Sequence, residues 1–211
     1  AFAITSLLSD RECIQYSMDK PRLYSPQHLV DCADESYGAS ACLGADTQQA
    51  FTFTDVKTGG GLRLDECYPY TSGQSGDKGS CVRDHCTTES PFAVYGSTQT
   101  RLFYDYDNIA IAQEVKNGPV YFSMQVFDDF LKYKGGIYTP SSTAQNLGGH
   151  AIRVLGWGVE DGQYYWIGAN QWNTSWGEKG FFRISFNAWI GYKAGSAIAV
   201  GAVSDPVLNS N

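Results

Sequence analysis

The 211-residue chain is 43% hydrophobic, which is enough for a substantial core, either as one large domain or as two lobes that share a cleft. Its net charge is -7 at pH 7, and its 15 basic residues are scattered along the sequence. This pattern argues against a surface that follows phosphates, so we expect no nucleic acid partner. No window approaches the roughly 18 apolar residues of a membrane span, so we expect no membrane span either.

The first half of the chain is predicted to be mainly helical. Residues 1–18 place apolar side chains at helical spacing, and no N-cap precedes them, so we expect this helix to start before the first residue given. A second helix is predicted in YSPQHLVDC, with Ser25 as N-cap and Pro26 as its first residue. A further helix is predicted over 49–56. The glycine- and serine-rich residues 58–81 are predicted to be irregular and held in place only by cross-links.

The six cysteines, which all lie in this first half, favour cross-links over metal binding. They stand at positions 13, 32, 42, 67, 81 and 86, and none forms a close C-x-x-C pair. Zinc spacing is therefore weakly supported, and disulfides in an oxidising compartment are favoured. Spacing alone leaves the pairing of the cysteines open. We predict no metal and no cofactor.

The second half of the chain is predicted to be mainly β, with a lobe boundary near residues 90–95. One more helical pattern covers 108–116. After Gly118-Pro119 the sequence is rich in aromatic and branched residues, which are typical of strands. Apolar and polar side chains alternate over 182–186, as in a half-buried strand.

Two strand-like runs, AIRVLGWGV and QYYWIGANQW, predict a β-hairpin. They flank Glu160-Asp161-Gly162, which reads as a three-residue loop with Gly162 in the left-handed region. If Val159 then faces Gln163, His150 lies opposite Trp172 and diagonal to Asn170. A slip of one residue would place Asn170 on the other face of the sheet.

This register brings an amide to an imidazole. Diagonal partners have Cα atoms about 7 to 8 Å apart, so Asn170 is expected to reach a ring nitrogen of His150. Fixing one nitrogen sets the tautomer of the other, as a general base requires, and Trp172 is expected to shield the hydrogen bond. Another reading, a core histidine satisfied by local polar groups, stays open. The other histidines, His28 and His85, are expected at the surface without a function.

Residues 148–184, GGHAIRVLGWGVEDGQYYWIGANQWNTSWGEKGFFRI, resemble the His and Asn region of papain-like cysteine proteases, particularly the cathepsin B branch. AFAITSLLSDREC and YSPQHLVDC resemble earlier segments of that family, so the resemblance covers nearly the whole chain. It implies an α+β fold with two lobes and an active-site cleft between them. The helical left lobe would span 1–92 and an antiparallel, β-barrel-like right lobe 93–211. Whether the C-terminal tail returns to the left lobe is left open.

The resemblance also implies a catalytic mechanism. The nucleophilic cysteine would stand two positions before Ala1, outside the given sequence, and the glutamine of the oxyanion hole would also lie upstream. His150 would be the general base and acid, and Asn170 would orient it. Gly149, Trp172 and Trp176 would support this pair. No G-x-S-x-G motif offers a serine nucleophile instead.

Similarity to cathepsin B suggests how the cysteines pair. It implies the disulfides Cys32–Cys81 and Cys67–Cys86, and it would pair Cys13 and Cys42 with cysteines upstream of Ala1. A mutual Cys13–Cys42 bridge is the alternative, and the family pattern opposes it.

By the same similarity, a set of small and polar residues would bind substrate. The residues are Gly44, Ala45, Asp46, Thr47, Ser123, Ala151 and Ala197. Ala45 replaces the second glycine of the family's C-N-G-G, which would alter the backbone groove. Ala197 replaces the acid of the cathepsin B S2 pocket, so a preference for arginine is not carried over. No histidine lies between Cys67 and Cys81, where cathepsin B has its occluding loop, and this favours endopeptidase activity.

The expected function is therefore that of a cysteine endopeptidase. It would be lysosomal, vacuolar or secreted, would be made as a zymogen, and would act on peptides or proteins. A propeptide or cystatin-type inhibitors would be its partners. The alternative is a catalytically inactive papain-fold protein that binds peptides or serves as a structural interaction module. Ala45 and the family-atypical residues 192–195 favour that alternative.

Overall fold

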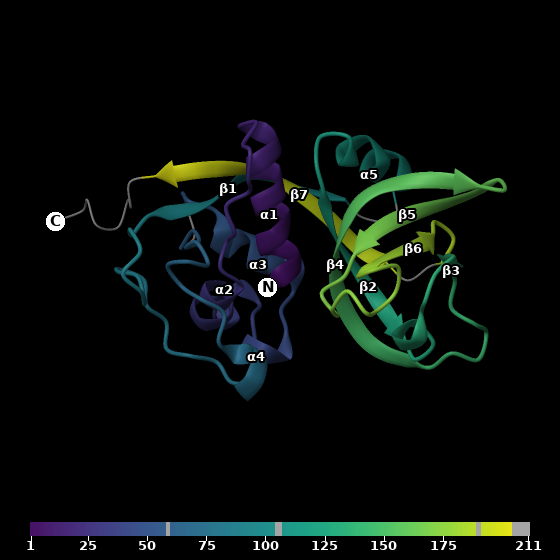
Figure 1. The fold of residues 1–211 in the computed structure, drawn as a ribbon, viewed down its shortest axis with the longest axis horizontal. Helices are drawn as coiled ribbons and strands as arrows, with labels where there is room; N and C mark the ends of the chain where they lie inside the picture. Colours follow the sequence, from purple (N-terminus) through teal and green to yellow (C-terminus); the bar gives the residue numbers. More distant parts are fainter. Residues whose placement is uncertain (58–59, 104–106, 189–190, 204–211) are drawn as a thin grey trace. The chain divides into compact units, whose positions relative to one another are not determined.

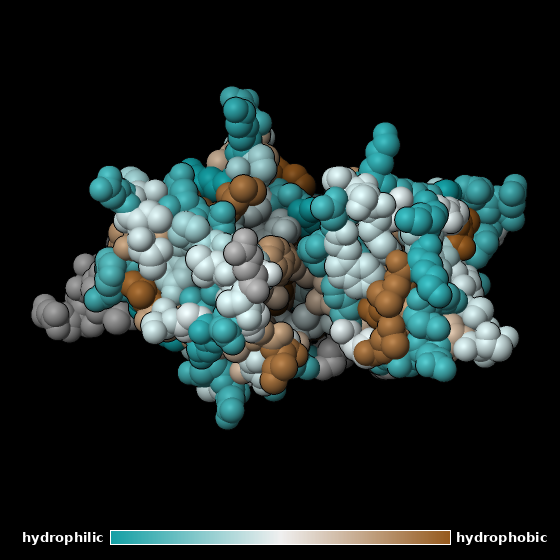
Figure 2. Space-filling model, turned by 60° about the horizontal axis from the view of Figure 1, so that its bottom comes forward, coloured by the Kyte–Doolittle hydropathy of each residue, from teal (hydrophilic) through white to brown (hydrophobic). Residues whose placement is uncertain are grey.

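The computed structural model describes residues 1–57, 60–103, 107–188 and 191–203 (Figure 1). The contact pattern divides them into two units: Ala1–Thr100 with the described residues from Ala197 onward, and Arg101–Ser196. Helices dominate the first unit and strands the second, which confirms the α+β class. Figure 2 shows apolar residues as small separate patches among hydrophilic ones, an ordinary distribution for folded domains. Within the described residues, every helix is too short or too polar to cross a bilayer.

Helix α1 (Phe2–Gln15) supplies the main apolar face of the first unit. Ala3, Ile4, Leu7 and Leu8 recur at helical spacing, and all four are buried. The helix ends at Gln15, three residues before the end of the predicted segment. Helix α3 (Thr47–Thr54) also differs slightly from its prediction. It starts earlier because the Asp46 side chain caps it, accepting hydrogen bonds from the backbone N–H groups of Gln48 and Gln49.

Helix α2 (Pro26–Cys32) starts as the sequence predicts. Oγ of Ser25 accepts a hydrogen bond from the His28 backbone N–H at 2.9 Å, and it donates to the Tyr68 carbonyl oxygen at 2.5 Å. Pro26 follows at the position where a helix needs no N–H donor. Ser25 is fully buried, so its hydroxyl joins the helix start to a distant segment.

Ser25→Ala should therefore destabilise the protein by about 1–2 kcal/mol, because it removes a helix cap and leaves a buried carbonyl without its donor. Chemical denaturation at neutral pH measures this change. Ser36→Ala is the matched control, because the Ser36 hydroxyl bonds only to Asp34 in an exposed turn. We expect a change below about 0.5 kcal/mol for the control, and equal effects of the two substitutions would contradict the assignment.

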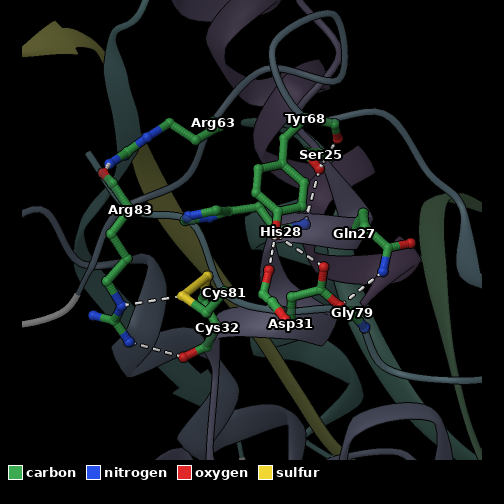
Figure 3. Close-up of a disulfide and its surroundings, with 11 residues drawn as sticks. Ser25, Gln27, His28, Asp31, Cys32, Arg63, Tyr68, Gly79, Cys81 and Arg83 are labelled. Carbon is green, nitrogen blue, oxygen red and sulfur yellow. Dashed lines mark hydrogen bonds between the residues drawn. A yellow bond between two sulfur atoms is a disulfide. The ribbon is translucent and has the colours of Figure 1, made fainter. Parts of the chain in front are cut away.

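The described part of the irregular segment 58–81, with the short helix α4 (Ser72–Ser75), is held by more than cross-links. Residues 58 and 59 lie outside the described residues. The carboxylate of Asp31, buried in α2, accepts hydrogen bonds from the Gly79 backbone N–H at 2.7 Å and from Gln27 Nε2 at 2.8 Å. The Tyr68 hydroxyl lies 2.9 Å from the other carboxylate oxygen (Figure 3). The prediction that only cross-links secure this segment is thus wrong.

Two disulfides tie the first unit together. They join Cys32 to Cys81 and Cys67 to Cys86, the same pairs that the resemblance implies. Cys13 and Cys42 are free thiols in the structure, so the alternative bridge between them does not form. The other short helices of this unit are η1 (Glu35–Tyr37) and η2 (Ala41–Leu43).

The second unit is built on strands of one sheet with the order β1-β7-β2-β4-β5-β6-β3. The bounds are β2 (Val120–Phe127), β3 (Ile137–Tyr138), β4 (Asn146–Glu160), β5 (Gln163–Ala169) and β6 (Phe181–Ser185). Strands β1 (Val94–Phe103) and β7 (Gly191–Val203) each run from one unit into the other. The neighbours β2–β4, β4–β5 and β5–β6 are antiparallel, whereas β3 pairs with β6 in parallel. Helix α5 (Asn108–Val115) and the short helix η3 (Phe130–Lys132) complete the unit.

The hairpin register combines a wrong prediction with a correct one. Glu160 faces Gln163, so the loop has two residues rather than three, and both Asp161 (φ 50°) and Gly162 (φ 79°) adopt left-handed conformations. This is the backbone that a short Asp-Gly hairpin turn favours. The predicted pairing is therefore displaced by one residue near the turn. An extra residue in β4, Leu155, then restores it, because Val154 faces Gly168 while Gly156 faces Ile167.

Candidate active site

His150 lies near the start of β4, on the strand face that packs into the core. It is half-buried and faces Met124 of β2, which is fully buried. Ile152 and Val154 follow on the same face because side chains alternate along a strand. The two preceding glycines are exposed, and a Cβ atom built on either would meet no atom within 4 Å. The imidazole therefore lies between the packed core and the exposed, unobstructed start of β4.

Asn170 follows directly after β5, where pairing with β4 has ended. Its backbone N–H donates to the carbonyl oxygen of Gly180 at 3.0 Å, which fixes the chain as it leaves the strand. Its side-chain Oδ1 lies 2.9 Å from Nε2 of His150, and the Gln171 backbone N–H donates to the same oxygen at 2.9 Å. The predicted Asn–His pair therefore lies within hydrogen-bond distance.

The second contact of Asn170 fixes the tautomer of His150. The Gln171 N–H can donate only to an acceptor, so the carboxamide must turn its oxygen toward it. The same oxygen faces Nε2 of His150, which therefore carries the proton of the neutral ring. Nδ1 is left with its lone pair. The arrangement can therefore take up a proton at Nδ1 without turning the ring.

Trp172 covers the imidazole, although it is not a strand partner of His150. The two rings are stacked, with centroids 5.0 Å apart and planes inclined by 23°. Trp176 packs edge-on against Trp172 at 5.2 Å, and its Nε1 donates to the Leu131 carbonyl oxygen at 3.2 Å. Burial lowers the pKa of His150, while the hydrogen bond to Asn170 opposes that shift. The unprotonated ring is thus favoured at neutral pH.

The predicted substrate-binding residues of the second unit lie together. Ser123 of β2 and Ala151 of β4 are direct partners in the antiparallel ladder. Both are half-buried, and alternation places them on the sheet face opposite His150. They form a pair of small side chains on that face.

The predicted substrate-binding residues of the first unit have different environments. Gly44 (φ 104°) and Ala45 are exposed, and Ala45 forms an isolated antiparallel bridge with Ala39. Asp46 has a structural role as the cap of α3, and Thr47 begins that helix. Ala197 is buried. Among residues 192–195, the side chains of Tyr192 and Lys193 lie outside the described part of the chain.

The two other histidines differ from each other. His85 is exposed and pairs with Asp84 at 2.7 Å, in line with its predicted surface position. His28, however, is fully buried, so its predicted surface position is wrong. Periodicity gives no signal for this burial, because six of the seven residues of α2 are buried rather than one stripe of the helix. The described residues hold no group of three or more acidic, cysteine or histidine side chains suited to a metal ion.

The sequence of the chain matches a known protein family. The papain family cysteine protease profile matches residues 1–200. A gut-specific cysteine proteinase of Caenorhabditis elegans is 35% identical over 198 residues, and the match covers 87% of this chain and 59% of that protein. Cathepsin B-like cysteine proteinase 5 of the same organism is 32% identical, with 87% and 61% covered. The chain thus spans about three fifths of the length of these relatives.

Solved structures agree on the fold. The proform of cathepsin B S9 from Trypanosoma congolense superposes with a TM-score of 0.80 at 26% identity, covering 95% of this chain and 68% of the other. Digestive procathepsin L2 from the larval midgut of Tenebrio molitor gives a TM-score of 0.76 at 28% identity, covering 93% and 59%. With the match over residues 1–200, these likenesses show that the chain belongs to the papain family of cysteine proteases.

Proposed function

We propose that this chain supplies the general base and its orienting amide to a cysteine endopeptidase that cleaves peptides or proteins. The observation that carries the proposal is the 2.9 Å contact between Nε2 of His150 and Oδ1 of Asn170, with Nδ1 left to accept a proton. Membership of the papain family supports a thiolate as the nucleophile. As the resemblance predicts, that thiol would belong to a cysteine two positions before Ala1.

In the proposed mechanism His150 transfers two protons, one in each half of the reaction. Nδ1 takes the thiol proton, and the thiolate attacks the carbonyl carbon of the scissile peptide bond. The imidazolium then donates the proton to the leaving amine nitrogen, which leaves a thioester. Nδ1 next takes a proton from water, whose oxygen attacks the thioester carbonyl, and the imidazolium gives this proton to the departing sulfur. Because burial lowers the pKa of His150, the imidazolium is a stronger acid toward the leaving groups.

The finer parts of the proposal concern substrate and setting. As the resemblance implies, Ser123, Ala151, Ala197 and residues 44–47 would contact substrate. Ser123 and Ala151 would do so from the sheet face opposite His150. The absence of histidine between Cys67 and Cys81 supports endopeptidase over dipeptide-removing activity. The solved relatives named above are proforms, which supports synthesis with an inhibitory propeptide. We further propose cystatin-type inhibitors as partners and a lysosomal, vacuolar or secreted location.

Labelling of the full-length protein tests the nucleophile. An epoxide inhibitor of cysteine peptidases should add once, and peptide mass spectrometry should locate the adduct on a cysteine two positions before Ala1. Prior alkylation with iodoacetamide should block the reaction. A serine or glycine at that position, with no labelling, would instead establish the catalytically inactive papain-fold module.

Asn170→Ala in the full-length protein should lower kcat/KM by roughly 10- to 150-fold, since a hydrogen bond to a charged group contributes about 1.5–3 kcal/mol. The loss should fall mainly on kcat, because the amide positions His150 rather than the substrate. Asn170→Asp should move the limb of the pH profile that reports His150 to higher pH, since a carboxylate favours the imidazolium. Asn187→Ala, at an exposed position, is the control. An unchanged kcat and pH profile in both Asn170 variants would refute the positioning role.

A further inference from the structure

His28 is a buried histidine for which the proposed mechanism has no use. It lies in α2, is fully buried, and packs against the rings of Phe53 and Tyr68, with centroids 5.6 Å and 5.3 Å away. Among the described residues, neither ring nitrogen has a hydrogen-bond partner. Figure 3 shows the side chain pointing toward the side of the cluster where Arg83 lies. In the part of the chain that the structure describes, no acceptor is therefore placed to receive a hydrogen bond from the ring.

The charged groups around His28 also oppose a positive ring. Arg63 and Arg83 both act on it as nearby positive charges. Arg83 is held in place, because its guanidinium donates to the Cys32 carbonyl oxygen at 2.9 Å and to Cys81 Sγ at 3.3 Å. Arg63 donates to the carbonyl oxygen of Arg83. A protonated His28 would thus add a third positive charge to a cluster that already holds two.

The carboxylate of this cluster, Asp31, is already engaged. It accepts hydrogen bonds from Gly79 N–H and Gln27 Nε2, and the Tyr68 hydroxyl lies within hydrogen-bond distance of it. Tyr68 is no counter-charge either, because burial and Asp31 raise its pKa to about 12. A charged His28 that turned toward Asp31 would compete with these donors for its carboxylate. Protonation and the packing of this segment are therefore in competition.

The consequence for stability has a definite sign. Burial, with help from Arg63 and Arg83, lowers the pKa of His28 from 6.5 to about 3. The unfolded chain binds the proton below pH about 6.5, and the folded chain does not. The stability supplied by the neutral ring is complete above that pH and is lost as the pH falls toward about 3. The equilibrium constant for unfolding rises by up to about tenfold for each pH unit below about 6.5. At pH 5 it is about 30-fold larger than at neutral pH.

We propose that His28 is an acid-sensitive lock, whose uncharged ring is needed to keep α2 packed against the segment that carries Gly79, Cys81 and Arg83. Protonation releases that segment, which stays attached through the Cys32–Cys81 disulfide. The lock lowers the stability of the folded protein in acid. This effect does not depend on whether the protein is a peptidase.

Denaturant unfolding of the full-length protein between pH 7.5 and pH 5 tests the lock. Between pH 7.5 and pH 5, the unfolding constant of wild type should rise about 30-fold more than that of His28→Leu. His28→Asn, which is polar but does not titrate, should behave as His28→Leu does. His85→Leu removes the exposed histidine and should keep the wild-type slope. Equal slopes in wild type and both His28 variants would overturn the proposal.

Two measurements on wild type keep the test decisive if the variants do not fold. Hydrogen exchange, corrected for intrinsic rates, should show residues 72–83 opening more at pH 5 than at pH 7.5. Nuclear magnetic resonance of the His28 ring should show no protonation of the folded form near pH 6.5. A His28 that titrates near its ordinary pKa in the intact fold, or a segment equally protected at both pH values, would refute the lock.

Discussion

Replacement of His150 by alanine in the full-length protein should lower kcat/KM by about 10²- to 10⁴-fold, the range that a positioned general base and acid contributes. The reason is the tautomer that Asn170 imposes, which leaves Nδ1 ready to take the proton of a nucleophile. The fold should be retained, because His150 is only half-buried at a strand end. Hydrolysis of a fluorogenic peptide measures the effect, with circular dichroism as the check on folding.

His85→Ala is the matched control for this substitution. It removes another imidazole from a position where the side chain is 68% exposed and pairs only with neighbouring Asp84. Activity should stay within about twofold of wild type, as for most surface substitutions. A His150→Ala protein with wild-type activity, or an equal loss in both variants, would be incompatible with the assigned role.

The second large effect concerns the disulfides of the first unit. The Cys32→Ala/Cys81→Ala protein should be less stable by about 4 kcal/mol, and the Cys67→Ala/Cys86→Ala protein by about 3 kcal/mol. The order follows from the sequence separations of 49 and 19 residues, since the longer loop restricts the unfolded chain more. Urea denaturation under non-reducing conditions measures both values.

Leu43→Ala serves as the control, because Leu43 lies in the same unit, is 93% exposed and takes part in no expected disulfide. It should leave the urea midpoint unchanged. If the Cys67–Cys86 pair proved the more important, or if neither loss exceeded the control, chain entropy would not be the main contribution of these bonds.

The sequence predicts helix starts well where capping chemistry is explicit. Ser25 with Pro26 marks the first residue of α2 because a serine acceptor and an imino residue suit the same helix end. The start of α3 is less apparent, since the resemblance assigns Asp46 to substrate binding and gives no sign of its role as a cap. A side chain with two plausible roles is assigned only when its hydrogen bonds are seen.

The sequence predicts the Asn–His pair, but it predicts only part of the backbone geometry that brings the two side chains together. Strand alternation and a hairpin bring residues 150 and 170 to the same region, and this needs only the sequence. The loop length was wrong by one residue, and the bulge at Leu155 compensates for that error. Nothing in the local sequence marks Leu155 as the bulge. The contact from the Gln171 N–H to Asn170 likewise depends on the backbone beyond β5.

The burial of His28 and Asp31 shows where sequence reasoning fails physically. Both are polar residues on a short helix, and polar residues are ordinarily placed at the surface. Asp31 is compensated by donors from residues 27, 68 and 79, two of which are distant in the sequence. The His28 ring can be buried because it stays neutral and so avoids the cost of burying a charge. Such compensation by remote partners is invisible before the chain is folded.

The bulge at Leu155 divides β4 into two modules, the tip and the end near His150, and the strand pairing of each is set separately. Toward the tip, the pairing is governed by Asp161-Gly162, whereas toward His150 it is governed by the partners in β2 and by Arg153 opposite Ala169. Lengthening the exposed tip alters one module and leaves the other in place. A peptide tag inserted between Asp161 and Gly162 is thus a route to immobilise or label this protein while preserving the geometry around Asn170.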